Sequence, residues 1–204
     1  MNGWAWAAFA LYLAWAGTAF GIRAVLQRRR TGDAGYRGIS GRPGTAPWWA
    51  GILFAASLLG GAAAPVAALT GLPALVGIEE PAVHWTGLLI TLAGMALTLA
   101  SQTNMGASWR VGVDAGERTA LVTGGLFAHV RNPVFTAMVF TAAGLALMVP
   151  NWIAVLALAA LVAAVQLQVR VVEEPYLSTV HAEAYDAYTV RTGRFLPGIG
   201  TRTV

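Results

Sequence analysis

The chain has 204 residues, of which 57% are hydrophobic and only 11% are charged. A soluble domain carries about a quarter charged residues, so this composition predicts an integral membrane protein. All 13 basic residues are arginine and lie in short stretches between apolar runs, which indicates membrane topology rather than a nucleic-acid partner. There is no cysteine, which excludes disulfides, thiolate metal sites and cysteine catalysis.

Apolar runs, taken in chain order, predict an all-α integral membrane protein with about five transmembrane helices. Each run has about 20 residues, enough to cross a hydrocarbon core of about 30 Å. The predicted spans are residues 4–22, 47–69, 83–105, 133–149 and 152–172. The last two belong to a single uncharged run with Pro150-Asn151 at its middle, and these two turn residues predict a C-terminal helical hairpin.

The arginines also predict an orientation. Every arginine falls on one side of a five-span topology, and the positive-inside rule assigns that side to the cytoplasm. We therefore expect a multi-pass protein of the inner (plasma) membrane, with its N-terminus outside and its C-terminus in the cytoplasm. The tail after Glu174 mixes aromatic and charged residues and is predicted to be a cytoplasmic amphipathic helix. We expect one membrane domain over residues 1–204, with three helices in 1–105 and two in 106–204.

The first candidate for chemistry is Arg131-Asn132-Pro133, where the fourth span begins. Asparagine is a common N-cap, proline suits the first helical turn, and arginine is ordinary at a membrane interface. A helix N-terminus beside an arginine is also a binding site for a carboxylate. Both interpretations stay open at this point.

The second candidate lies at the inner end of the fifth span, where Arg170 is followed by Glu173 and Glu174. Arg170 and Glu174 are four residues apart and would share a helix face, as in many surface ion pairs. The hairpin returns this end to the depth of Arg131, so the sequence predicts that these charged groups converge on one pocket. The three histidines have no partners at metal-ligand spacing, and we expect no metal.

These motifs, in this order, resemble the family of integral-membrane methyltransferases that includes isoprenylcysteine carboxyl methyltransferases and phospholipid methyltransferases. The family core reads approximately Leu-Val-Thr-x-Gly-x-Tyr, then Arg-His/Asn-Pro-x-Tyr, a hairpin, and Arg-x-x-x-Glu. The matching positions here are Leu121-Val122-Thr123, Gly125, Phe127, Arg131-Asn132-Pro133, Phe135, Arg170 and Glu173-Glu174, followed by Tyr185, Tyr188 and Pro197. The resemblance covers about residues 106–197.

The resemblance implies S-adenosylmethionine as the cofactor, bound at the cytoplasmic end of the bundle. The positions that it assigns to the cofactor are Leu121, Val122, Gly125, Phe127, Asn132, Pro133, Phe135, Glu173 and Glu174. It assigns Arg170 to the substrate, and Arg131 is the second candidate for a catalytic role.

The expected partners are membrane lipids and a lipophilic or small-molecule methyl acceptor: a lipid amine, a small thiol or an isoprenoid carboxylate. Phe127 and Phe135 replace two family tyrosines, and Asn132 replaces the histidine of prenylcysteine enzymes, which weakens that particular substrate assignment. The alternative is a non-enzymatic transporter or assembly factor. A transporter should carry ionisable groups or broken helices near the bilayer midplane, where the spans here are apolar except for Pro65. The sequence therefore favours the enzyme.

Overall fold

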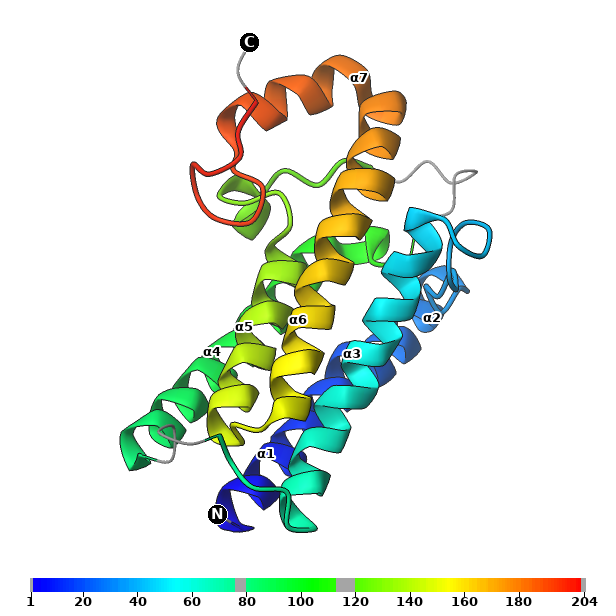
Figure 1. Cartoon of the computed structure of the whole chain (residues 1–204). Helices are drawn as coiled ribbons and strands as arrows, with labels where there is room; N and C mark the ends of the chain where they lie inside the picture. The colour runs from blue at the N-terminus through cyan, green and yellow to red at the C-terminus, as the bar shows by residue number, and fades with distance from the viewer. Residues whose placement is uncertain (1, 76–79, 113–119, 203–204) are drawn as a thin grey trace.

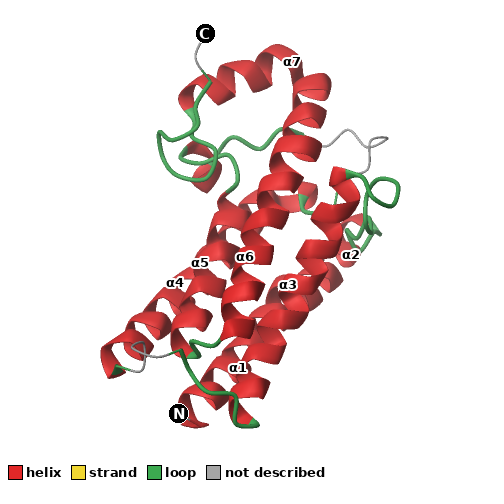
Figure 2. Cartoon of the chain, in the orientation of Figure 1, coloured by secondary structure: helices red, strands yellow, loops and turns green. Residues whose placement is uncertain are grey.

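The computed structural model of the chain describes residues 2–75, 80–112 and 120–202, and these ranges contain helices and loops but no strand (Figure 2). Five long helices form one bundle (Figure 1). They are α1 (Asn2–Ala16), α3 (Ala46–Leu69), α4 (Pro81–Met105), α5 (Pro133–Met148) and α6 (Trp152–Leu167). Four of the helical stretches are long and apolar enough to cross a membrane, and α5 is a shorter apolar helix. The predicted all-α membrane fold is confirmed.

The first and last spans extend beyond their predicted inner ends. A π-helical turn, Gly17–Ile22, joins α1 directly to α2 (Arg23–Thr31). A second π-helical turn, η4 (Gln168–Glu173), joins α6 to α7 (Glu174–Arg191). The helices therefore continue past the predicted span ends at residues 22 and 172, because hydropathy indicates where a helix leaves the membrane and not where its hydrogen bonding stops.

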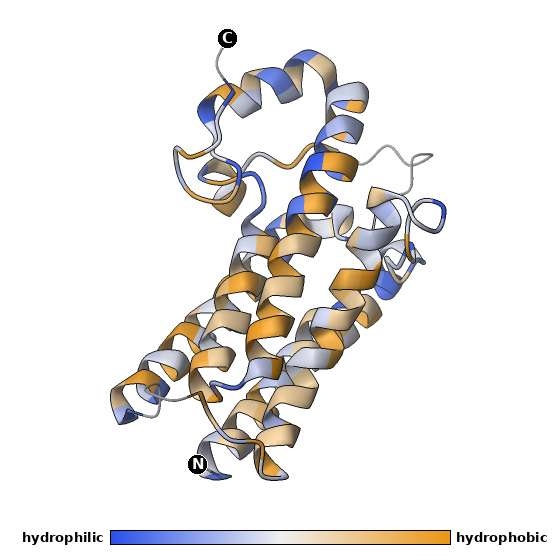
Figure 3. Cartoon of the chain, viewed as in Figure 1, coloured by the Kyte–Doolittle hydropathy of each residue, from blue (hydrophilic) through white to orange (hydrophobic). Residues whose placement is uncertain are grey.

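Hydropathy divides the molecule into two parts. The five bundle helices are mostly apolar, whereas the polar residues gather on α2, on α7 and in the C-terminal segment (Figure 3). The continuation of α6 through η4 and α7 rises past the ends of α3 and α5 (Figure 1). The two termini lie at opposite ends of the bundle, as an odd number of spans requires (Figure 1).

The predicted hairpin between α5 and α6 is present, and Asn151 fixes its turn. The Asn151 side-chain oxygen accepts a hydrogen bond from the Ala154 amide at 3.0 Å, which caps the first turn of α6. Its Nδ2 donates to the Ala64 carbonyl at 2.9 Å, which ties the turn to α3. Asn151 is almost completely buried, so these bonds satisfy its amide away from water.

Close contact between α4 and α5 depends on glycine. A Cβ added at Gly94 would lie 2.5 Å from Thr141 Oγ1, and one added at Gly144 would lie 2.5 Å from the Thr91 amide nitrogen. Small residues bring helix backbones together in a membrane, where van der Waals packing rather than the hydrophobic effect holds helices to each other. The α4 and α5 backbones therefore lie in close contact at these glycines.

The C-terminal tail is helical, but it is not a simple surface helix. The α7 helix bends at Ala182, whose φ of 37° is unusual for a non-glycine residue. Beyond the bend, Tyr185 and Tyr188 are buried, so these aromatic side chains pack inside the protein. The chain then turns back, and the Arg131 amide donates to the Gly193 carbonyl at 2.8 Å.

Candidate active site

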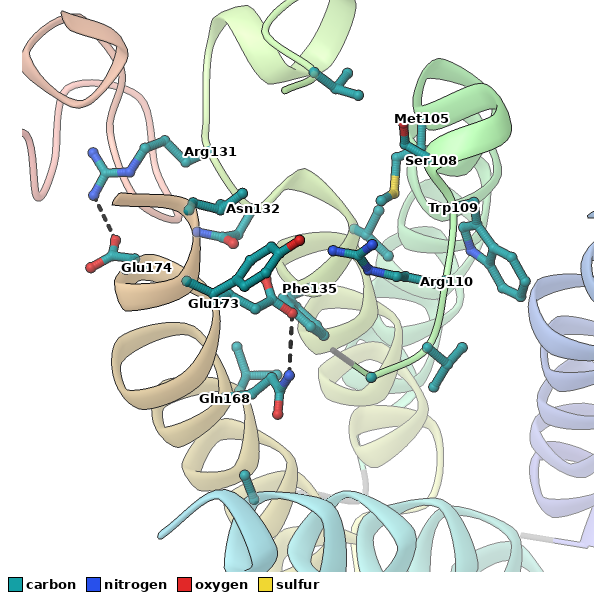
Figure 4. A pocket seen from close by; sticks show the side chains of 18 of the residues that line it. Met105, Ser108, Trp109, Arg110, Arg131, Asn132, Phe135, Gln168, Glu173 and Glu174 are labelled. Atoms are coloured by element: carbon teal, nitrogen blue, oxygen red, sulfur yellow. Dashed lines mark hydrogen bonds and ion pairs between the residues drawn. The ribbon is translucent and has the colours of Figure 1, made fainter. Parts of the chain in front are cut away.

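A cavity opens at the end of the bundle that carries η4 and α7. It contains about 1550 Å³ of empty space, open mouth included. Its walls come from α3, the end of α4, α5, η4 and α7 (Figure 4). Because these elements are distant in the sequence, only the folded bundle creates this cavity.

Three residues beside the cavity form a buried ionic cluster, which we call the clamp: Arg131, Glu174 and Arg194. Glu174 Oε1 accepts from Arg131 Nη2 at 2.9 Å and from Arg194 Nε at 2.7 Å, and Oε2 accepts from Arg194 Nη2 at 2.9 Å. Burial alone would raise the pKa of the Glu174 carboxyl, but the bonds from Arg194 and Arg131 outweigh it and hold that pKa below its ordinary value. Glu174 is therefore an ionised and fully engaged carboxylate.

The clamp joins the start of α5 to the C-terminal segment. The Arg131 guanidinium also donates to the carbonyls of Thr192 at 2.6 Å and Gly200 at 3.1 Å. Arg131 thus holds the chain on both sides of the C-terminal turn. Figure 4 shows its guanidinium directed at Glu174 rather than into the centre of the cavity. This geometry fits a residue that positions the site.

The neighbouring carboxyl, Glu173, lies in the cavity wall. Gln168 Nε2 donates to Glu173 Oε1 at 3.4 Å, and in Figure 4 Glu173, Phe135 and Arg110 gather at the centre of the view. Burial raises the pKa of the Glu173 carboxyl to about 7, even though the Gln168 bond and the positive charge of Arg110 act in the opposite direction. The two adjacent glutamates therefore occupy different electrostatic environments.

Most of the residues predicted from the sequence lie together in the structure. Those that line the cavity are Leu121, Val122, Phe127, Arg131, Asn132, Phe135, Glu173 and Glu174. Gly125 and Pro133 are not in the lining. Gly125 has a φ of +61°, and a Cβ there would lie 2.5 Å from Asn104 Nδ2, so this glycine permits close packing against the end of α4. Pro133 is buried as the first residue of α5.

The expected convergence of Arg170 with Glu174 and Arg131 is wrong. Arg170 is exposed, and its Nε donates to Gln166 Oε1 at 2.7 Å. The Glu174 carboxylate is already bound by Arg131 and Arg194, an arginine that lies 20 residues further along the chain. Helical spacing predicted a shared face but not this competing partner.

Asn132 also differs from its predicted role as a capping residue. Its side chain makes no hydrogen bond that caps α5. Instead, Nδ2 donates to the Arg194 carbonyl at 3.0 Å, so the amide helps to hold the C-terminal segment. Pro133 does begin the helix as predicted.

Sequence reasoning missed Gln168 and Tyr176 in the cavity wall, and it named the loop that ends at Arg110 as a third candidate for chemistry without assigning Arg110 a role. The guanidinium carbon of Arg110 lies 5.6 Å from the centre of the Tyr176 ring, within cation–π range. Gln168 gave one usable signal: it is a polar residue inside an apolar run, and it follows Leu161 and Val165 on one helix face. No local pattern pointed to Tyr176.

The cavity combines a charged rim with an apolar interior. Glu173 supplies a carboxyl and Arg110 a guanidinium, whereas Phe135, Val134 and Met138 supply apolar surface. A carboxylate and a guanidinium in one wall match the ammonium and carboxylate of a zwitterionic α-amino acid. The cavity thus suits a ligand with one such end and an apolar body.

The fold and this site define a multi-pass helical membrane protein with a ligand cavity at one end of its bundle. A family model described as phospholipid methyltransferase matches residues 82–184, half of the chain. The chain belongs to this family, and it is a membrane methyltransferase. Comparison with curated proteins gives no match. The resemblance predicted from the motifs is confirmed, and the family favours the enzyme over a transporter or assembly factor.

Proposed function

We propose that the protein transfers a methyl group from S-adenosylmethionine to a lipophilic acceptor. The observation that carries this proposal is the cavity, in which Glu173 and Arg110 stand at the rim of an apolar interior. Family membership supplies the reaction class, and the cavity supplies places for two ligands of different polarity.

The described residues fit the cofactor. Glu173 would bind its ammonium group and Arg110 its carboxylate, as charge-assisted hydrogen bonds. Leu121, Val122 and Phe135 would cover its less polar parts, and Asn132 would offer an amide. When bound, S-adenosylmethionine supplies a methyl group on a positively charged sulfur. Arg131 and Glu174 would act through the clamp, and we leave exposed Arg170 outside the site.

The acceptor would lie in the apolar interior, between Phe54 of α3, Met138 of α5 and Val165 of α6. Methyl transfer is an in-line displacement, so the contribution of the walls is to exclude water and to hold the nucleophile at the right distance and angle. A lipid amine, a small thiol and an isoprenoid carboxylate all meet this requirement.

The orientation inferred from the arginines belongs to the same proposal. We place the cavity at the cytoplasmic face of the inner (plasma) membrane, with the N-terminus outside. A reporter fused at the C-terminus should then be cytoplasmic, and one inserted near Glu80 should be external. Finding both reporters on one side would contradict the five-span topology.

The experiment that tests the function is methyl transfer from isotopically labelled S-adenosylmethionine by protein in lipid nanodiscs. The acceptors to compare are a lipid amine, an alkyl thiol and an isoprenoid carboxylate. We expect labelled product from at least one of them, and none when the cofactor is replaced by its demethylated form. Cofactor that fails to bind to the folded protein would contradict the proposal.

A further inference from the structure

A second cavity lies next to the first, further along the bundle. It contains about 540 Å³ of empty space between α1, α3, α5 and α6. We call it the deep cavity, because its lining continues away from the charged rim along each of these helices. It is outside the set of residues to which a cofactor or catalytic role has been assigned above.

The same face of α3 lines both cavities. Gly51 and Phe54 border the first cavity, and Leu58 and Gly61 border the deep one. Steps of three and four residues keep these positions on one side of a helix. The two cavities therefore follow each other along a single face of α3.

The other walls repeat this order. On α6, Val165 lines the first cavity and Leu161, one turn away, lines the deep one. On α5, Met138 lines the first and Ala142 the deep cavity. The lining thus passes from one cavity to the other on three helices, so the two cavities follow each other along the bundle.

Aromatic rings separate the two parts. Phe54 and Phe20 border the first cavity, and their ring centres are 6.3 Å apart in an edge-on contact. The centre of the Phe20 ring lies 5.6 Å from that of Trp15, which borders the deep cavity. These contacting rings therefore lie where the lining passes from one cavity to the other, and Phe54 belongs to the face of α3 that lines both.

The walls of the deep cavity suit a hydrocarbon. Ala142, Ala146 and Ala154 line it with small apolar side chains. The hydroxyl groups of Tyr12, Ser57 and Thr141 already donate to backbone carbonyls within the bundle. A chain without polar groups would therefore leave these bonds intact.

We propose that the two cavities form one channel for the hydrocarbon tail of the methyl acceptor, and that Phe54 is the gate that limits how far the tail enters. This rests on the proposed function, since it is the acceptor's reactive end that would stay in the first cavity. From Phe54 to Pro65 the axis of α3 rises by about 16 Å, so the deep part adds room for many methylene groups. Phe54 is thus a specificity-determining residue for chain length.

The test uses primary alcohols that carry a photoreactive diazirine at the far end of the chain. Two have straight chains of about eight and about twenty carbons, because about twelve further methylenes extend a chain by about 15 Å, close to the rise of about 16 Å along α3 on the far side of Phe54. The third is an isoprenoid alcohol of the longer length. After irradiation of the full-length protein in nanodiscs, mass spectrometry locates the labelled peptides.

We expect a long alcohol to label the α3 and α6 segments around Gly61 and Ala157, and the short alcohol to label only the first cavity.

Phe54→Ala should raise labelling of the deep cavity by the long alcohol about fourfold at limiting concentration, the gain for about one further buried methylene. Ala146→Leu, which fills the deep cavity, should abolish the labelling of the deep cavity by the long alcohol. Ala56→Leu is the matched control, since Ala56 lies on the exposed face of α3.

Labelling of the deep cavity by either long alcohol supports the channel, and the better-labelled chain identifies the type of tail. The proposal is overturned if both long alcohols label only the first cavity or lipid-facing positions such as Leu59. This decision needs the wild-type protein alone, so it stands even if a variant fails to fold. Labelling requires no methyl transfer, and cofactor binding measured on the same sample separates failure of the channel from failure of the proposed function.

Discussion

Glu173 and Glu174 are neighbours in the sequence but belong to two different regions of the molecule. Glu174 lies in the clamp, where Arg131 and Arg194 donate hydrogen bonds to both of its carboxylate oxygens. Glu173 lies in the cavity wall, where its carboxyl accepts a hydrogen bond from Gln168 Nε2 at 3.4 Å. In the clamp, the Glu174 carboxylate is bound by charged side chains of the protein. In the cavity wall, the Glu173 carboxyl borders the cavity.

This difference separates stability from function. Both oxygens of Glu174 already accept hydrogen bonds from Arg131 and Arg194, and breaking a buried ion pair of this kind is strongly destabilising because it leaves a charge unpaired. A carboxyl with an elevated pKa in a cavity is a typical component of a binding or catalytic site. We therefore assign stability to Glu174 and ligand binding to Glu173.

The largest expected effect is on the clamp. Glu174→Gln should lower the free energy of unfolding by about 3–5 kcal/mol, because it leaves the buried Arg131 guanidinium without its counter-charge. Denaturant unfolding in mild detergent measures this loss. Glu173→Gln is the matched control, and a similar loss of stability in both variants would remove the distinction between the two regions.

The pH dependence of stability should differ in sign between the two carboxyls. The pKa of Glu174 is lowered, so its contribution is present near neutral pH and is lost as the pH falls through the folded-state value. The pKa of Glu173 is raised from 4.5 to about 7, so its ionisation should reduce stability as the pH rises across that window. Unfolding of Glu173→Gln between these pH values should show a shallower fall than the wild type. An unchanged slope would contradict the assignment.

A smaller effect is expected where α7 meets the loop before α5. The Tyr188 hydroxyl donates to the Phe127 carbonyl at 2.5 Å, and both residues are buried. Tyr188→Phe should lower the free energy of unfolding by about 1–2 kcal/mol, the usual result of leaving a buried acceptor unpaired. Thermal unfolding would detect it, and no change in melting temperature would mean that water replaces the bond.

The smallest effect is expected at Arg170. Its contact with Gln166 is exposed, so Arg170→Ala should change stability by less than about 0.5 kcal/mol. Cofactor affinity and methyl transfer should stay close to those of the wild type. A large loss of turnover with normal stability would return Arg170 to the active site that the family resemblance suggested.

The sequence predicted the fold well because hydropathy and arginine placement record the membrane directly. The turn at Pro150-Asn151 was equally plain, since both residues interrupt a long apolar run. The sequence also predicted which residues lie close together at the site, since Asn132, Phe135 and Glu173 do line one cavity. The hydrogen bonds among the site residues were not predicted, because Arg194 reaches Glu174 only after the C-terminal segment has folded back. Helical spacing favoured Arg170, and no local pattern carries information about a competing partner 20 residues away.

The most direct test of the account is calorimetric titration of S-adenosylmethionine into wild-type protein and Glu173→Gln near pH 8, where Glu173 is ionised. We expect binding to the wild type and affinity about 10 to 100 times weaker in the variant, the range for a hydrogen bond that involves a charged group. Arg170→Ala should bind like the wild type. Equal affinity in wild type and a folded Glu173→Gln variant would contradict the claim that this carboxyl holds the cofactor.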